Sequence, residues 1–112
     1  FQTKDLIGAM ENDGANFSEL RVDGGMVANN WFSQQLANIL NIDVLRPKVI
    51  ETTALGASYL ASMKAGLCPN IESLNSSWES EKTYLPEEKE TKILQEKYQV
   101  WLSAVERTKG LY

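Results

Sequence analysis

The stretch 20–32 constrains the fold of this chain most, because a short apolar alternation passes through two adjacent glycines into a helical pattern. Leu20 and Val22 carry the alternation, which is typical of a half-buried strand. Gly24 and Gly25 allow the tight turn that joins this strand to the helix. Such a turn leaves backbone N–H groups without partners beside the positive end of a helix dipole, where a phosphate can approach. An ordinary Asp–Gly turn is the competing interpretation, since the spacing matches neither a Walker loop nor the three-glycine dinucleotide fingerprint.

The composition argues against several kinds of partner. The 112 residues carry 11 Lys and Arg against 15 Asp and Glu, and the net charge of −4 without a long basic run predicts no nucleic-acid partner. Histidine is absent and Cys68 is the only cysteine, so we expect no metal site and no internal disulfide. Cys68 has no activating neighbour in sequence and is interpreted as inert. No apolar run approaches the ~18 residues that span a bilayer. A cytoplasmic protein without a membrane partner is expected.

Hydrophobic periodicity predicts helices that alternate with strands. Asn41 suits the end of one helix, Gly66 the end of another, and Pro86 the start of the last. The part between the last two helices is expected to be irregular, with Trp78 as its anchor. The expected helices cover residues 1–12, 28–40, 54–65 and 86–109, the strands 17–23 and 42–46, and the irregular part 67–84.

Each helix has an expected buried face. The helix 54–65 has no charged residue from 54 to 63, so we expect it to be buried, with a threonine hydroxyl that caps its first turn. In the helix 28–40, the buried stripe comprises Phe32, Leu36, Ile39 and Leu40, while Asn30, Gln34 and Asn38 face away. In the last helix the buried stripe comprises Leu94, Tyr98, Trp101, Leu102 and Val105.

This order of elements predicts the α/β class. Strands that alternate with helices imply βαβ units and a parallel sheet. The length is that of one ordinary domain, in which a single core could bury roughly 65% of the unfolded surface. Two strands are too few for such a sheet, and the chain begins at Phe1 without an initiator Met. We therefore expect the missing strands upstream, in a longer protein.

Several motifs follow one another in a distinctive order. They are VDGG at 22–25 with Asn29 four residues after Gly25, QLAN at 35–38, Arg46-Pro47, ETTALGASYLA at 51–61, and Tyr98, Trp101 and AVER at 104–107 near the end. Together they resemble the C-terminal ATP-binding domain of the FGGY carbohydrate kinases. The resemblance covers essentially all of residues 1–112, although Asn38 stands where the family often has Asp.

The resemblance implies part of an actin-like, or ribonuclease-H-like, ATPase domain. It also implies that Gly24 and Gly25 approach the phosphate–ribose part of ATP and that Asn29 reaches the adenine. In this family Mg-ATP is the phosphoryl donor, and both the catalytic Asp and the sugar-binding residues lie in the upstream part. No catalytic residue is therefore expected here, and the isolated chain is expected to be inactive.

The substrate follows from the same resemblance. VANN at 27–30, with the Arg-Pro and Glu-Thr-Thr elements, favours the members that phosphorylate glycerol to glycerol 3-phosphate, working as homo-oligomers of the full-length protein. The alternatives are members that act on xylulose, ribulose or gluconate, and a non-catalytic nucleotide-binding module of the same actin-like fold. A plain interaction domain with an ordinary Asp–Gly turn also remains open.

Overall fold

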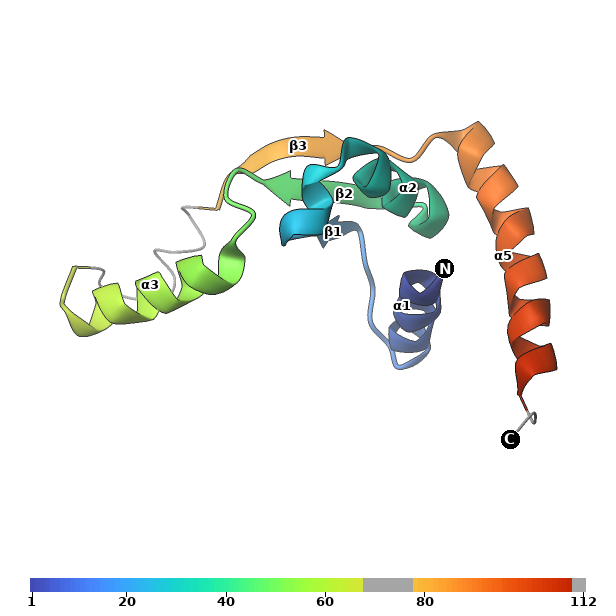
Figure 1. Cartoon of the computed structure of the whole chain (residues 1–112), viewed down its shortest axis with the longest axis horizontal. Helices are drawn as coiled ribbons and strands as arrows, with labels where there is room; N and C mark the ends of the chain where they lie inside the picture. The colour runs from blue at the N-terminus through green and yellow to red at the C-terminus, as the bar shows by residue number, and fades with distance from the viewer. Residues whose placement is uncertain (68–77, 110–112) are drawn as a thin grey trace.

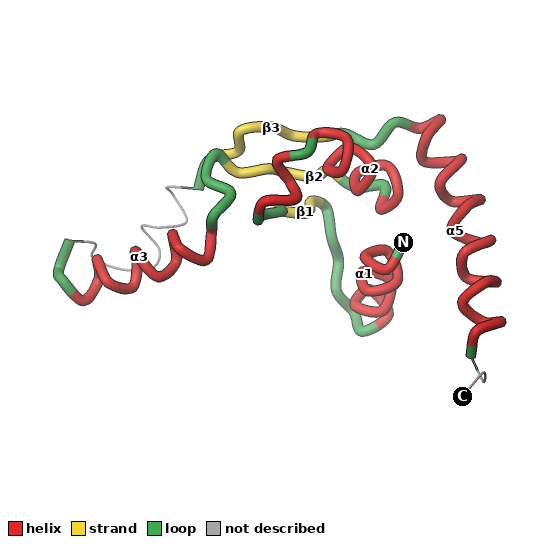
Figure 2. The backbone as a smooth tube through the Cα atoms, viewed as in Figure 1, coloured by secondary structure: helices red, strands yellow, loops and turns green. Residues whose placement is uncertain are grey.

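A computed structural model describes residues 1–67 and 78–109. A three-stranded sheet occupies the middle of the molecule, and α3 and α5 extend away from its opposite ends (Figure 1). The segments between the elements, and the short 3-10 helix before α2, can be followed in Figure 2. In chain order the elements are α1 (Gln2–Asn12), β1 (Glu19–Arg21), η1 (Gly25–Ala28), α2 (Asn30–Leu40), β2 (Asp43–Pro47), α3 (Thr52–Lys64), β3 (Ser80–Tyr84) and α5 (Glu88–Thr108).

The sheet confirms the α/β class and the parallel β1–α2–β2 unit. β1 pairs with β2 in parallel, with Leu20 opposite Val44. β2 pairs with β3 in antiparallel, with Val44 opposite Tyr84. The expectation that residues 67–84 are irregular was wrong for β3. This strand lies at the sheet edge and is exposed except at Tyr84, so it lacks the apolar alternation that marks a half-buried strand.

A small core lies between α2 and the sheet. Ala37 and Val44 are completely buried, and Tyr84 is 3% exposed. Leu20, Val22 and Leu36 pack around these three residues and stay partly exposed. The strand β1 is shorter than expected, and α2 begins at Asn30 rather than at residue 28, because the 3-10 helix η1 occupies the residues before it. The core is therefore built by one helix and the middle of one sheet.

Two of the three polar residues of α2 that were expected to face away, Gln34 and Asn38, contact other elements instead, whereas Asn30 is exposed. Asn38 is fully buried, and its Oδ1 accepts hydrogen bonds from the Glu87 backbone N–H (2.8 Å) and from Gln34 Nε2 (3.1 Å). Gln34 Nε2 also donates to the Leu85 carbonyl (2.8 Å). These side chains hold the segment that leads into α5. A hydrophobicity pattern registers an amide as polar whether it meets water or another element.

The carbonyl of Ile39, near the end of α2, joins two further helices. It accepts from Lys4 Nζ of α1 (3.2 Å) and from Gln95 Nε2 of α5 (3.1 Å). The last carbonyls of a helix lack intrahelical partners, and a cationic donor satisfies them well. Asn41 ends α2 in the left-handed conformation at φ 59°, as expected.

Helices α1 and α5 also meet through aromatic rings. The Phe1, Tyr98 and Trp101 ring centroids lie 5.7 to 5.9 Å apart. The Tyr98 hydroxyl donates to the Asp5 carboxylate, and this hydrogen bond raises the pKa of Tyr98. The expected stripe of α5 is only partly buried, however, and Thr91 is the single buried residue of that helix.

Helix α3 is exposed, although its composition predicted a buried helix. It has no buried residue, and Leu60 is 65% exposed. Its N-cap residue, Glu51, makes no side-chain capping bond, so the expected threonine cap is also wrong. The radius of gyration is 17.8 Å, whereas a compact chain of this length has about 13 Å. The single large core that the length allows is therefore not formed within the described part.

We predict that Asn38→Ala destabilises the attachment of α5. The substitution removes the fully buried Oδ1 that accepts from both the Glu87 N–H and Gln34 Nε2, which costs about 1–3 kcal/mol. Thermal unfolding followed by circular dichroism measures the loss. Gln95→Ala is the matched control, since it removes one part-buried α2–α5 hydrogen bond and leaves the Ile39 carbonyl with Lys4 as its donor. Equal losses in the two variants would contradict the prediction.

Candidate functional site

The glycine turn lies directly after β1. Gly24 has φ 84° and ψ 168°, a conformation that is essentially restricted to glycine. Its N–H donates to the Ile50 carbonyl (2.8 Å), and its carbonyl accepts from the Val27 N–H (3.2 Å). The expectation of two free amides is therefore wrong for Gly24. The Gly25 N–H, at the start of η1, has no hydrogen-bond partner within the described residues.

Two hydrogen bonds tie this turn to the start of α3. One is the bond from Gly24 to Ile50. The other runs from the Thr52 hydroxyl to the Asp23 carboxylate. Thr52 therefore secures the end of β1 rather than capping its own helix. This contact makes Asp23 part of the turn.

Asn29 is the N-cap of α2. Its Oδ1 accepts from the backbone N–H groups of Trp31 (2.9 Å) and Phe32 (3.4 Å). The side chain is exposed, and its Nδ2 has no partner in residues 1–67 and 78–109. The carbonyl half of this amide thus satisfies the helix, while the N–H half is available to a ligand. Gly24, Gly25 and Asn29 lie along one continuous segment that connects the sheet to α2.

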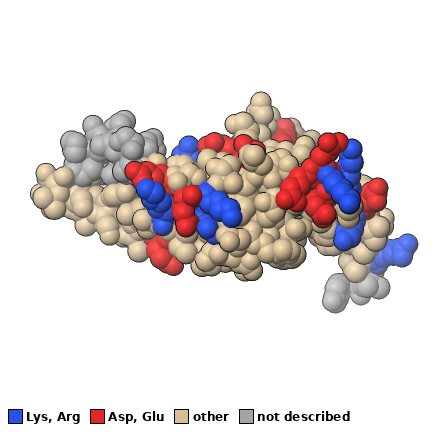
Figure 3. Space-filling model, turned by 90° about the horizontal axis from the view of Figure 1, so that it is seen from above, with Lys and Arg blue, Asp and Glu red and all other residues tan. Residues whose placement is uncertain are grey.

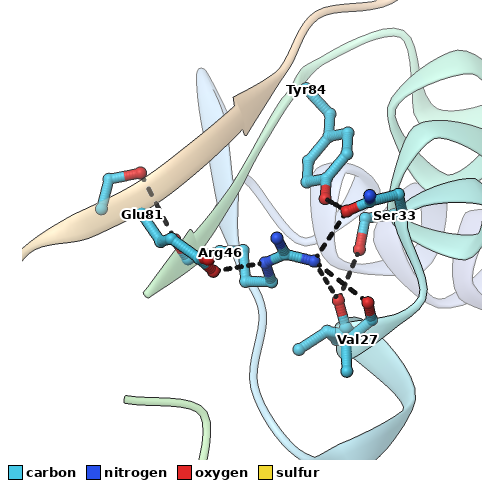
Figure 4. A network of polar contacts seen from close by, with 8 residues as sticks. Val27, Ser33, Arg46, Glu81 and Tyr84 are labelled. Carbon is cyan, nitrogen blue, oxygen red and sulfur yellow. Dashed lines mark hydrogen bonds and ion pairs between the residues drawn. The ribbon is translucent and has the colours of Figure 1, made fainter. Parts of the chain in front are cut away.

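Arg46 forms hydrogen bonds to residues 27, 28 and 30 of that segment (Figure 4). It lies on β2, is only 8% exposed, and its Nη1 donates to the carbonyls of Val27 (3.0 Å) and Ala28 (3.3 Å) and to Asn30 Oδ1 (2.9 Å). Its Nε donates to Glu81 Oε2 on β3 (2.9 Å). One guanidinium therefore connects the end of η1, the start of α2 and two strands.

Two hydroxyl groups reinforce these contacts. The Tyr84 hydroxyl donates to Asn30 Oδ1 (2.6 Å), and Ser33 Oγ donates to the Val27 carbonyl (3.3 Å). The sequence prediction used Arg46 only as part of a motif and missed this role. The sequence contains one indication that Arg46 is buried. This residue follows Val44 by two residues, so strand alternation places both side chains on the same buried face.

Charged residues of both signs interleave over the strands (Figure 3). Lys48 and Glu79 form an ion pair between the end of β2 and the residues before β3, and their hydrogen bond raises the pKa of Lys48 and lowers that of Glu79. Both side chains are exposed, so water screens the pair. Nearby, the Arg21 guanidinium lies 4.2 Å from the ring centroid of Trp78. Trp78 is partly buried, in keeping with its expected role as an anchor.

The described part of the chain holds no group of three or more His, Cys, Asp or Glu side chains that could bind a metal ion. None of its helices is long and apolar enough to cross a membrane. Cys68 lies outside the described residues.

A comparison with protein families identifies the class of protein to which this α/β unit and its strand-to-helix glycine turn belong. Residues 1–65 match the C-terminal domain of the FGGY family of carbohydrate kinases, and the chain belongs to this family. Among curated proteins, it is 44% identical over 108 residues to glycerol kinase of Coxiella burnetii, covering 96% of this chain and 21% of that protein. It is 48% identical over 111 residues to glycerol kinase of Ectopseudomonas mendocina, covering 98% and 22%. The chain thus spans about a fifth of the length of these relatives.

Solved structures show the same fold. A xylulose kinase of Lactobacillus acidophilus superposes with a TM-score of 0.73 at 22% identity, over 85% of this chain and 19% of that one. A gluconate kinase of the same organism gives 0.77 at 21% identity, over 90% and 20%. At this identity the likeness shows the fold alone, and the expected actin-like ATPase fold is confirmed.

We predict that the two glycines differ in their tolerance of a side chain. Gly24→Ala should cost about 1–3 kcal/mol, because alanine is strained at this positive φ. Gly25→Ala should change stability by less than about 0.5 kcal/mol, since Gly25 has no positive φ and an added Cβ meets no atom within 4 Å. Urea denaturation monitored by fluorescence compares them, and similar losses in both would contradict the assignment.

Proposed function

We propose that this chain is the ATP-binding portion of an enzyme that transfers a phosphoryl group from Mg-ATP to glycerol, giving glycerol 3-phosphate. One observation carries the proposal. Glycerol kinases are 44–48% identical to the chain over nearly all of its residues, and the stretch that they match includes the glycine turn and Asn29. The geometry supports it, because the turn exposes a free backbone N–H and an unpaired amide group on the same segment.

In the proposed complex, the backbone at Gly24 and Gly25 lies along the phosphate–ribose part of ATP. The free Gly25 N–H is suited to donate to an anionic or ribose oxygen. Gly25 also lacks a side chain that would keep the nucleotide away from the backbone. Asn29 contacts the base through Nδ2, while its Oδ1 continues to cap α2.

The remaining parts of the reaction are proposed to lie outside these 112 residues. Phosphoryl transfer requires a group that positions or deprotonates the acceptor hydroxyl, together with Mg²⁺ that neutralises phosphate charge. The described part offers no acidic cluster for the ion, so we assign its ligands to none of these residues. No catalytic base is assigned to the chain either, and on its own it should produce no ADP.

The proposal is tested by ADP production in the full-length polypeptide that carries this sequence. Mg-ATP is supplied with glycerol, xylulose, ribulose or gluconate in separate reactions. We expect turnover that depends on glycerol. Turnover with a different substrate would keep the kinase activity and overturn the choice of glycerol, and ADP binding without any turnover would favour the non-catalytic module.

We predict that Asn29→Ser and Asn29→Ala separate the two roles of this residue. Serine is also a good N-cap, so Asn29→Ser should retain stability, whereas Asn29→Ala should lose about 0.5–2 kcal/mol. Both variants lack the Nδ2 donor and should bind ADP more weakly by about five- to tenfold. Calorimetric titration and thermal unfolding of the full-length polypeptide provide the two measurements. Wild-type ADP affinity in Asn29→Ser would show that Asn29 is only a cap.

A further inference from the structure

We propose that Arg46 is a positioning residue for residues 25–30, here called the nucleotide segment. It fixes the backbone on both sides of Asn29. This inference rests on the proposed function, because it gives Arg46 a role in the binding of ATP. Arg46 does not need to touch the nucleotide. It acts through the three acceptors that its Nη1 holds.

The position of these acceptors is the first argument. Ala28 and Asn30 are the residues immediately before and after Asn29, and Arg46 Nη1 bonds the carbonyl of the first and Oδ1 of the second. The same nitrogen also bonds the Val27 carbonyl. A single donor group therefore sets the backbone path of residues 27–30, which includes the junction between η1 and α2.

The second argument is the chemistry of these groups. The carbonyls of Val27 and Ala28 lie at the end of the short 3-10 helix η1, where no following turn of that helix supplies backbone N–H donors. A buried cation is costly unless it is hydrogen-bonded, and Arg46 bonds Glu81 through Nε and the two carbonyls and Asn30 through Nη1. The two carbonyls and Arg46 Nη1 therefore satisfy one another, and the backbone of residues 27–30 has little freedom to move while the guanidinium remains in place.

The third argument is that these polar contacts are distinct from the apolar packing of the core, and Tyr84 alone of the core cluster takes part in both. Helix α2 packs on the sheet through Ala37, Val44 and Tyr84 and is held to α5 by Asn38. The segment 25–30, in contrast, is secured to β2 and β3 by Arg46 with support from Tyr84 and Ser33. Loss of the guanidinium should therefore loosen the nucleotide segment more than the fold.

The test compares Arg46→Lys and Arg46→Met with Glu81→Ala in the full-length polypeptide. Lysine keeps the charge but has a single nitrogen, which cannot reach Glu81 and the three acceptors of the segment together. Both Arg46 variants should raise the KM for ATP about tenfold or more, with the KM for glycerol unchanged, because bonds to a charged donor are worth about a tenfold change each. Glu81→Ala leaves the bonds to residues 27–30 intact and should keep the KM for ATP within about twofold.

A purely structural role predicts a different result. A destabilised enzyme has a smaller active fraction, so the apparent kcat falls while the KM for ATP stays the same. That result, or equal increases in the KM values for ATP and glycerol, would overturn the proposal. If neither Arg46 variant folds, Asn30→Ala decides, since Asn30 is exposed and the change removes one of the three Nη1 acceptors, together with the acceptor of the Tyr84 hydroxyl. An unchanged KM for ATP in Asn30→Ala would also overturn it.

ADP affinity, measured by calorimetry, separates this inference from the proposed function. A wild-type protein that binds ADP but does not turn over with glycerol contradicts the proposed reaction alone. In that case weaker ADP binding by Arg46→Lys than by Glu81→Ala still supports the role of Arg46, and equal binding overturns it. A wild-type protein that binds no ADP overturns both.

Discussion

The structure around the glycine turn depends on one buried positive charge. The Arg46 guanidinium is almost completely buried, and its hydrogen bonds compensate for the loss of hydration. Those bonds reach β3 through Glu81 and the η1–α2 junction through Val27, Ala28 and Asn30. Strand, turn and helix are therefore held in one relative arrangement by electrostatics, in a region where the apolar core is small.

The sequence pattern predicted most of the helices and strands because the residues that specify each of them are neighbours in the chain. The glycine turn, the left-handed Asn41 and the parallel pairing of β1 with β2 all follow from a few neighbouring residues. Burial could not be predicted in the same way. Helix α3 is rich in small and apolar residues but packs against little within the described part, while Asn38 is polar and completely buried. Burial depends on which elements meet, and the edge strand β3 shows that pairing can also occur without an apolar pattern.

The residues of the candidate site also divide into those that the sequence indicated and those whose contacts are distant in the chain. Gly24 and Gly25 were chosen because turn chemistry is local, Asn29 was chosen through the resemblance to the kinase family, and their roles toward ATP remain predictions. Arg46 was missed because its contacts join residues 16 to 35 positions apart. The hydrogen bond from Gly24 to Ile50 was missed for the same reason. A pattern can place Arg46 on the buried face of β2, but it cannot say which carbonyls the side chain will meet.

The glycine turn is attached to the base of helix α3. The Gly24–Ile50 and Asp23–Thr52 hydrogen bonds lie at the base of α3, and the rest of the helix projects away from the sheet (Figure 1). The backbone that they hold includes Gly24, at a φ of 84° that residues other than glycine rarely adopt. Contacts made on the exposed surface of α3 would therefore reach the turn through these two hydrogen bonds.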